Sequence, residues 1–260
     1  MGAHFLQLVP PPMPQIETHF ALGRILLFNL LGAILVWSWV SPGLMFWTEI
    51  DDVVFFATNA WLSEENEAWV LFVAATNHRL FDVFSLLNLL ALYLWAISRD
   101  PEQEHRLLRW GGIGVAMLLS AVFIAQGVRM GVPYTHPSPT LVYENVNLIT
   151  EMVDFWSKDR SGSSFPGDHG VNLLLFTAFM WRFAGLKLML VSALFAVLLS
   201  APRILSGAHW FSDVYFAAIA INLLVAPWIL LTPLAPGLSR ALTAGMVRVR
   251  NALPGQLSHL

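Results

Sequence analysis

The stretch APRILSGAHWFSD, residues 201–213, lies between two apolar runs and brings three ionisable side chains close to the edge of the hydrocarbon. Arg203 lies six positions before His209, and Asp213 lies four positions after it. Ionisable groups beside a membrane core are expensive to place, so the cluster indicates either chemistry or a helix end at the membrane boundary. A helix that begins near His209 would place Asp213 on the same face, where its carboxylate could hold the imidazole in one tautomer.

The composition of the chain around this stretch is that of a polytopic membrane protein. Of 260 residues, 57% are hydrophobic and only 12% are charged, whereas soluble domains are nearer half apolar and a quarter charged. Several windows reach the roughly 20 apolar residues that cross a bilayer. The chain has no cysteine, which excludes disulfides, thiolate metal sites and cysteine nucleophiles. The N-terminus lacks the pattern of a cleavable signal, so the first span is expected to remain.

Six apolar segments predict an all-α fold, a helical bundle of six transmembrane spans with short interfacial helices. The expected spans are residues 24–40, 81–97, 110–128, 170–184, 186–201 and 211–231. Acidic residues interrupt residues 44–76, which are therefore expected to form amphipathic helices at the interface. We expect a proline-rich N-terminal lead (1–20), one membrane domain (21–237) and a basic tail (238–260).

The distribution of basic residues predicts the orientation. With the N-terminus in the cytoplasm, nine of the fourteen lysines and arginines lie inside and five outside, as expected for a multi-pass protein of an inner (plasma) membrane. This topology places the long polar loop 129–169 and the stretch 201–213 on the same outer, periplasmic face. Two segments far apart in the sequence can therefore form one site.

The long loop carries two further polar pieces, each at the end of an expected span. RMGVPYTHP (129–137) follows the third span, and SSFPGDH (163–169) precedes the fourth. With the opening stretch they supply Arg129, His136, His169, Arg203, His209 and Asp213. Guanidinium groups bind phosphate oxygens bidentately. A neutral histidine can attack phosphorus while a protonated one gives its proton to the leaving oxygen, a scheme that needs no metal and no cofactor.

These three pieces resemble the signature of the type 2 phosphatidic acid phosphatase superfamily of membrane lipid phosphatases. That signature reads Lys-x6-Arg-Pro, then Pro-Ser-Gly-His, then Ser-Arg-x5-His-x3-Asp. The third part is met from Arg203 to Asp213, with Pro202 in place of the serine. The first part is altered at both cations, and the second keeps only its ends in PGDH (166–169).

The resemblance implies a role for each matched residue. His209 would be the nucleophile that forms a phosphohistidine, with Asp213 orienting it, and His169 would be the general acid. Arg129 and Arg203 would bind the phosphate oxygens. The position of the second cation of the first motif is held by a histidine, His136, which would bind phosphate in its place.

The altered second motif leaves three interpretations open. Gly167 can still offer an amide to the phosphate, but Asp168 brings a negative charge towards a negative substrate. Asp168 could cap the N-terminus of the fourth span and so align its amides with the site, which is the interpretation that we favour. Ser163 or Ser164 could instead supply the hydroxyl of the missing serine. A third interpretation is that the site passes phosphate to a second lipid rather than to water.

The resemblance therefore implies an enzyme that dephosphorylates a lipid phosphate or diphosphate. Candidate substrates are undecaprenyl diphosphate, phosphatidylglycerophosphate, phosphatidic acid and a lipid A phosphate. The alternative within enzymes is a phosphotransferase that moves phosphate from an isoprenyl diphosphate to another lipid such as lipid A. The alternative of another class is a non-catalytic transporter or scaffold of the same fold. The expected partners are the lipid substrate and membrane lipids, not nucleic acid. Four polar residues, Asn77, His78, Arg79 and Asp82, are expected only to fix the start of the second span.

Overall fold

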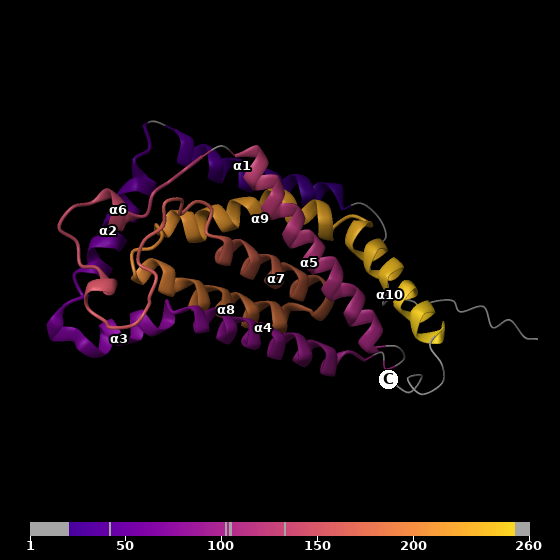
Figure 1. The fold of residues 1–260 in the computed structure, drawn as a ribbon. Coiled ribbons are helices and arrows are strands. Elements are labelled where there is room, and N and C mark those ends of the chain that lie inside the picture. Colours follow the sequence, from indigo (N-terminus) through magenta and orange to yellow (C-terminus); the bar gives the residue numbers. More distant parts are fainter. Residues whose placement is uncertain (1–20, 42, 102, 104–105, 133, 253–260) are drawn as a thin grey trace, which may run out of the picture.

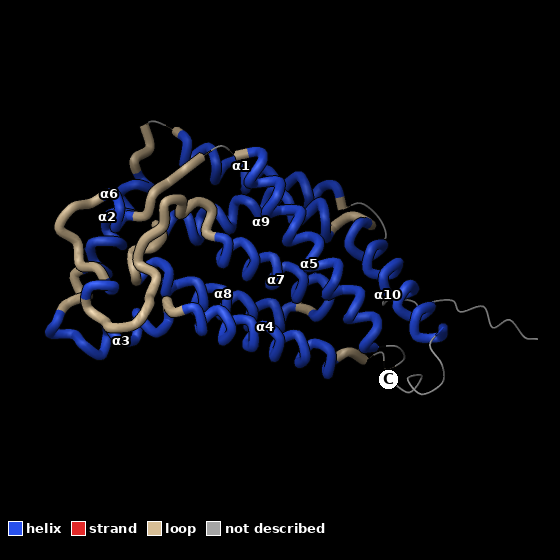
Figure 2. The backbone as a smooth tube through the Cα atoms, viewed as in Figure 1, coloured by secondary structure: helices blue, strands red, loops and turns tan. Residues whose placement is uncertain are grey.

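The computed structural model describes residues 21–252 apart from residues 42, 102, 104–105 and 133 (Figure 1). The predicted N-terminal lead and the last eight residues of the tail lie outside the described residues. Every regular element in the described ranges is a helix, so the all-α prediction is confirmed (Figure 2).

The helices follow the expected segments closely. They are α1 (Leu22–Val40), α2 (Phe46–Asn59), η1 (Glu64–Asn66), α3 (Glu67–Thr76), α4 (Arg79–Arg99), α5 (Arg106–Gly131), α6 (Pro139–Val142), η2 (Ile149–Glu151), α7 (Asp168–Ala184), α8 (Leu186–Leu205), η3 (Ser212–Phe216), α9 (Ala217–Leu230) and α10 (Leu234–Ala252). Within the described residues, five helices are long and apolar enough to cross a membrane: α1, α4, α5, α8 and the continuous η3–α9. The remaining expected span, α7, has 17 residues.

The bundle is built around α7, which packs against both α8 and α9 (Figure 1). Its first turn approaches η3 so closely that a Cβ atom on Gly170 would lie 2.3 Å from the carbonyl oxygen of Val214. Only glycine fits such an approach, and the contact brings the start of α7 against the residues that follow His209. On the outside, α1 covers α9, and the Asn29 amide donates to the carbonyls of Leu223 and Leu224. α10 lies along α5.

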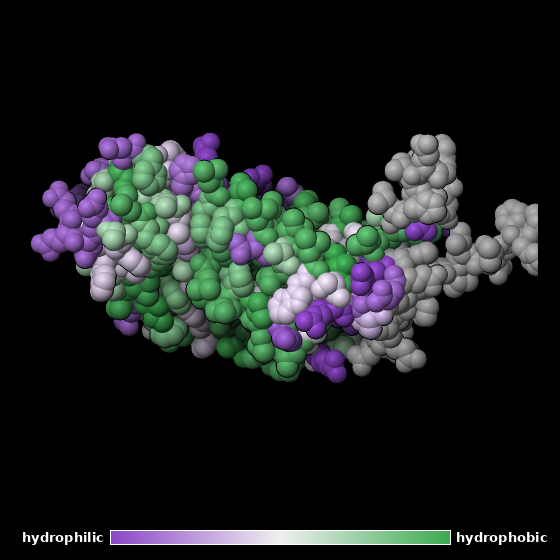
Figure 3. All heavy atoms as spheres, turned by 90° about the horizontal axis from the view of Figure 1, so that it is seen from below, coloured by the Kyte–Doolittle hydropathy of each residue, from purple (hydrophilic) through white to green (hydrophobic). Residues whose placement is uncertain are grey.

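The outer surface of the bundle is apolar along its length. Helices α1, α4, α5 and α8 expose many leucines, including Leu26, Leu87, Leu118 and Leu194, each more than half exposed. Figure 3 shows green over much of the middle of one face, with purple gathered towards the ends. An exposed apolar belt of this kind is the surface that a bilayer covers.

One end of the bundle carries α2, α3, α6 and the long loop (Figure 1). Helices α4 and α7 begin at this end, and α5 and α8 finish there. The loop is tied to the bundle by buried polar contacts, such as the hydrogen bond that Thr140 Oγ1 donates to Gly207 O over 3.2 Å. The long loop and the stretch 201–213 therefore lie at the same end of the bundle.

Candidate functional site

The three polar pieces meet at this end of the bundle, as predicted. The Ser164 hydroxyl donates to the carboxylate of Asp213, and the His136 ring contacts the same carboxylate. The Arg203 guanidinium lies 3.5 Å from His169 Nε2. Loop, α7, α8 and η3 therefore contribute to one polar cluster.

A tight turn places His209 beside Arg203. Gly207 adopts a φ of +72°, a conformation that L side chains rarely take, and its N–H donates to Ile204 O. The N–H of His209 then donates to the carbonyl of Arg203 over 3.0 Å. Such a left-handed glycine is the usual way to end a helix and reverse the chain. The motif spacing of Arg203 and His209 thus follows from the end of α8.

The expectation that His209 and Asp213 share one helix face is wrong. Residues 206–210 form the turn, and the next helix begins only at Phe211, so His209 precedes it. Asp213 lies in the π-helical η3, a wide turn of a kind that is frequent at functional sites. Among the described residues, no hydrogen bond or ion pair joins the carboxylate of Asp213 directly to His209.

The buried ring of His209 is held by the loop instead. Its Nδ1 lies 2.8 Å from the carbonyl oxygen of Ser164, which can only accept a hydrogen bond, so Nδ1 carries the proton and Nε2 carries the lone pair. Burial lowers the pKa of His209 to about 4, aided by the charge of Lys158 and, less strongly, of Arg203 and His169. At neutral pH the ring is therefore uncharged, with a free lone pair at Nε2.

Asp213 is fully buried and joins two loop residues. His136 Nδ1 lies 2.9 Å from Oδ2 and 3.1 Å from Oδ1, and the Ser164 hydroxyl donates to Oδ2. The His136 ring also stacks on Trp210, with centroids 5.3 Å apart. In the described part of the chain, Ser164 links Asp213 to His209, because its hydroxyl donates to Asp213 and its carbonyl accepts from the histidine.

A neighbouring buried carboxylate supports the start of η3. Asp51, from α2, accepts hydrogen bonds from the backbone N–H of Ser212 over 2.7 Å and from its hydroxyl over 2.5 Å. Burial raises the pKa of Asp51 to about 6, and the nearby charge of Asp213 adds to this while the Ser212 donors oppose it. Asp51 therefore fixes the backbone next to Asp213.

Arg203 and His169 share a carboxylate from α4. Asp82 Oδ1 lies 2.6 Å from Nη2 of Arg203 and 3.1 Å from Nε2 of His169. The amide oxygen of Asn77 accepts from Arg203 Nη1 over 3.2 Å, and its amide donates to Pro202 O over 2.8 Å. Arg203 is buried by these contacts, whereas His169 is partly exposed. The cation and the histidine are thus held in a common orientation.

The second motif does not act as the cap that we favoured from the sequence. Gly167 is itself the N-cap residue of α7, and Asp168 is the first helical residue without a side-chain cap, so the capping hypothesis is wrong. The Gly167 N–H donates to Asp213 O over 2.9 Å and is not free for phosphate. The Ser164 hydroxyl is likewise used by Asp213. Gly167 and Gly170 instead allow close packing on Val214.

Arg129 lies apart from the histidines. It is exposed near the end of α5 and lines a cleft of about 530 Å³ together with Asp168, at the start of α7. Among the described residues, no hydrogen bond or ion pair joins Arg129 to His209, His169 or Arg203. Its predicted place in the same phosphate-binding cluster is therefore not seen in the structure.

Comparisons with known proteins identify the family of the chain. A lipid A 1-diphosphate synthase of Escherichia coli (strain K12) is 37% identical to the chain over 241 residues, which is 92% of this chain and 97% of the relative. The model of the PAP2 superfamily matches residues 109–234. The chain belongs to the PAP2 superfamily. No solved structure matches it significantly.

Membership of the PAP2 superfamily confirms the resemblance seen in the sequence. The protein is a multi-pass membrane enzyme of a family of lipid phosphatases, and the transporter or scaffold alternative is set aside. The matched range contains all three motif pieces and runs from within α5 to just past the end of α9.

Two residues of the PAP2 site, Asn77 and Asp82, were expected from the sequence only to fix the start of the second span. His78 does cap α4, because its Nδ1 accepts from Leu80 N over 3.1 Å. Asn77 and Asp82, by contrast, bind Arg203. The signal that could have found Asp82 is its position at the start of an apolar span, where a carboxylate is expensive without a partner.

Replacing Asp82 by asparagine is expected to lower kcat of the PAP2 enzyme by about 10–100-fold, with a smaller change in KM. Hydrogen bonds to charged groups contribute about 1.5–3 kcal/mol, and Asp82 makes two such contacts. Steady-state kinetics of the purified variant measure the split, with the exposed Asp154→Asn as the matched control. Wild-type kcat in Asp82→Asn would show that the contacts do not orient the site.

Proposed function

We propose that this enzyme transfers the terminal phosphate of an isoprenyl diphosphate to the 1-phosphate of lipid A through a phosphohistidine on His209. The observation that carries the chemistry is the neutral His209, with its lone pair at Nε2 and three cationic or histidine side chains around it. The choice of acceptor rests on the relative named lipid A 1-diphosphate synthase, which matches nearly its whole length.

The first half-reaction breaks one bond and forms another. His209 Nε2 attacks the terminal phosphorus, a N–P bond forms, and the bond from phosphorus to the bridging oxygen breaks. The isoprenyl monophosphate leaves and takes the Nδ1 proton of protonated His169, whose Nε2–H donates to Asp82 and orients the ring. Arg203 stabilises the charge on the transferring oxygens, which is the main task of a protein in phosphoryl transfer.

The second half-reaction returns the enzyme to its starting state. A phosphate oxygen of the lipid A acceptor attacks the phosphorus, the N–P bond breaks, and the electron pair returns to Nε2. His169 gave up a proton in the first step, and it takes a proton from solvent to replace it. Attack by water in place of lipid A would release inorganic phosphate, which is the hydrolytic alternative.

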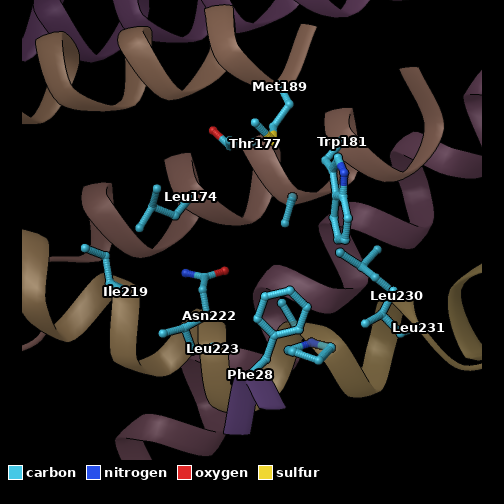
Figure 4. A pocket seen from close by; sticks show the side chains of 13 residues that line it. Phe28, Leu174, Thr177, Trp181, Met189, Ile219, Asn222, Leu223, Leu230 and Leu231 are labelled. Carbon is cyan, nitrogen blue, oxygen red and sulfur yellow. The ribbon is translucent and has the colours of Figure 1, made fainter. Parts of the chain in front are cut away.

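The membrane arrangement completes the proposal. We place α7 as a sixth span, because 17 residues extend about 25 Å, close to the roughly 30 Å of a bilayer core. The positive-inside rule then puts the site on the periplasmic face of the inner membrane. An almost wholly apolar cavity of about 410 Å³, lined mainly by α7 and α9, lies among the spans and suits a lipid chain (Figure 4).

A two-lipid assay tests this function. Purified enzyme in detergent is given an isoprenyl diphosphate labelled at its terminal phosphate, with and without lipid A, and His209→Ala is the control. Label on lipid A that depends on active enzyme supports transfer. Label that appears only as inorganic phosphate, at a rate unaffected by lipid A, would establish hydrolysis instead. No product in either form would overturn both.

The pH dependence follows from His209. We expect the acid limb of kcat/KM, the fall in rate as the pH decreases, to lie near pH 4, because burial and the charge of Lys158 lower the pKa of His209 to about 4 and keep the nucleophile neutral above that pH. As the pH falls through about 4, protonation removes the lone pair and the rate falls with it. Initial rates between pH 3.5 and 7 measure this limb. A limb centred near 6.5, the ordinary histidine value, would contradict the assignment.

A further inference from the structure

Lys158 lies on a part of the long loop whose neighbours on both sides are held by hydrogen bonds. The Ser157 hydroxyl donates to Ala74 O over 3.1 Å, and the buried Asp159 carboxylate accepts from the N–H and hydroxyl of Thr150 at 2.9 and 2.8 Å. Between them, the Lys158 N–H donates to Asn77 O over 3.2 Å. The backbone that carries this lysine is therefore fixed.

The same Asn77 joins Lys158 to the site. Its carbonyl holds the lysine backbone while its amide oxygen holds Arg203 Nη1. The lysine is half-buried, and its charge interacts with Arg203, His169 and His209. Burial and the neighbouring Arg203 lower the pKa of Lys158, while Asp168 and Asp82 oppose this. The positive charges of Lys158 and Arg203 thus lie in one region, and the single negative charge of Asp82 balances only one of them.

The site otherwise has too little positive charge for its substrate. A terminal phosphate carries close to two negative charges, and phosphoryl transfer relies on cations around its oxygens. Arg203 supplies one cation but is paired with Asp82. Arg129 is exposed in the cleft that it lines with Asp168, and His136 is turned to Asp213. Within the described ranges the Lys158 ammonium has no carboxylate within 4 Å, so it is free to bind an anion.

We propose that Lys158 is the second phosphate-binding cation of this site, acting with Arg203 on the oxygens of the transferring phosphoryl group. This assignment rests on the proposed function for the identity of the lipid, but not for the binding of phosphate itself. A lysine suits the role because its compact charge on a flexible stem can follow the phosphoryl group during transfer.

Inorganic phosphate tests the assignment without any lipid. The full-length enzyme in detergent is melted with increasing phosphate, since a ligand that binds the folded state raises Tm. We expect wild type and Lys158→Arg to be stabilised, and Lys158→Gln to need at least 10-fold more phosphate for the same shift. The matched control is Arg160→Gln, an exposed cation two residues along the loop that pairs with the exposed Glu151 and with the buried Asp159 and should keep the wild-type response.

Kinetics on the lipid substrate supply the second readout. Lys158→Gln is expected to lower kcat/KM by about 10–100-fold, the value of one charged hydrogen bond, with Lys158→Arg recovering most of it. Unchanged phosphate binding and kcat/KM in Lys158→Gln, or a loss found in Arg129→Gln instead, would overturn the proposal. Equal loss in Lys158→Arg and Lys158→Gln, with a lower Tm in both, would also overturn it by showing a structural role. Absence of lipid turnover in wild type would reject the proposed function while leaving the phosphate result to decide on Lys158.

Discussion

His209→Ala is expected to abolish formation of the phosphoenzyme and to lower turnover by at least about 10⁴-fold, as loss of a catalytic nucleophile does. The ring is buried and neutral, and Ser164 O leaves Nε2 as its only nucleophilic nitrogen. Wild-type enzyme mixed rapidly with labelled isoprenyl diphosphate should incorporate label that acid removes and alkali does not, the behaviour of a phosphohistidine. The variant should incorporate none.

The matched control for this experiment is His78→Ala. His78 lies at the same end of the bundle but only caps α4, and losing a cap costs about 0.5–2 kcal/mol of stability. Labelling should therefore persist in His78→Ala. Full labelling of His209→Ala would contradict this assignment. If the label in His169→Ala were also found on a side chain other than His209, that side chain would be the nucleophile.

The positions of the helices and of the three motif pieces could be predicted because they depend on local patterns. Apolar runs about 20 residues long define spans, and polar residues at their ends define loops. The basic residues put two of those loops on one face, and the structure brings them together around Asp213. Helix α7 is the shortest of the expected spans, and its start is set by the turn at Gly167 rather than by hydropathy.

The partners of the site residues could not be predicted, because they depend on contacts between distant segments. Asp82 and Arg203 are 121 positions apart, and nothing in the sequence near Asp82 points to its partner. The spacing of four residues also led to the wrong prediction that His209 and Asp213 share one helix face. The left-handed Gly207 ends α8 and delays the next helix, so residues four apart in sequence no longer share a face.

Asp213→Ala is expected to destabilise the fold by about 1–3 kcal/mol, the cost of leaving a buried hydrogen-bond donor without its partner. The carboxylate is fully buried between His136 and the Ser164 hydroxyl, and its loss leaves both without a partner. A fall in Tm should accompany a large loss of turnover.

The pH profile of the variants then distinguishes an indirect link between Asp213 and His209, through Ser164, from direct contact between the two side chains. Because Asp213 is linked to His209 through Ser164, the milder Asp213→Asn should lower kcat while leaving the acid limb near pH 4, where burial sets it. Coupling between His136→Phe and Asp213→Asn in a double-mutant cycle should amount to about 0.5–3 kcal/mol, as for residues in contact. A limb displaced by a full pH unit, with unchanged Tm and no coupling to His136, would show instead that Asp213 acts on the nucleophile itself.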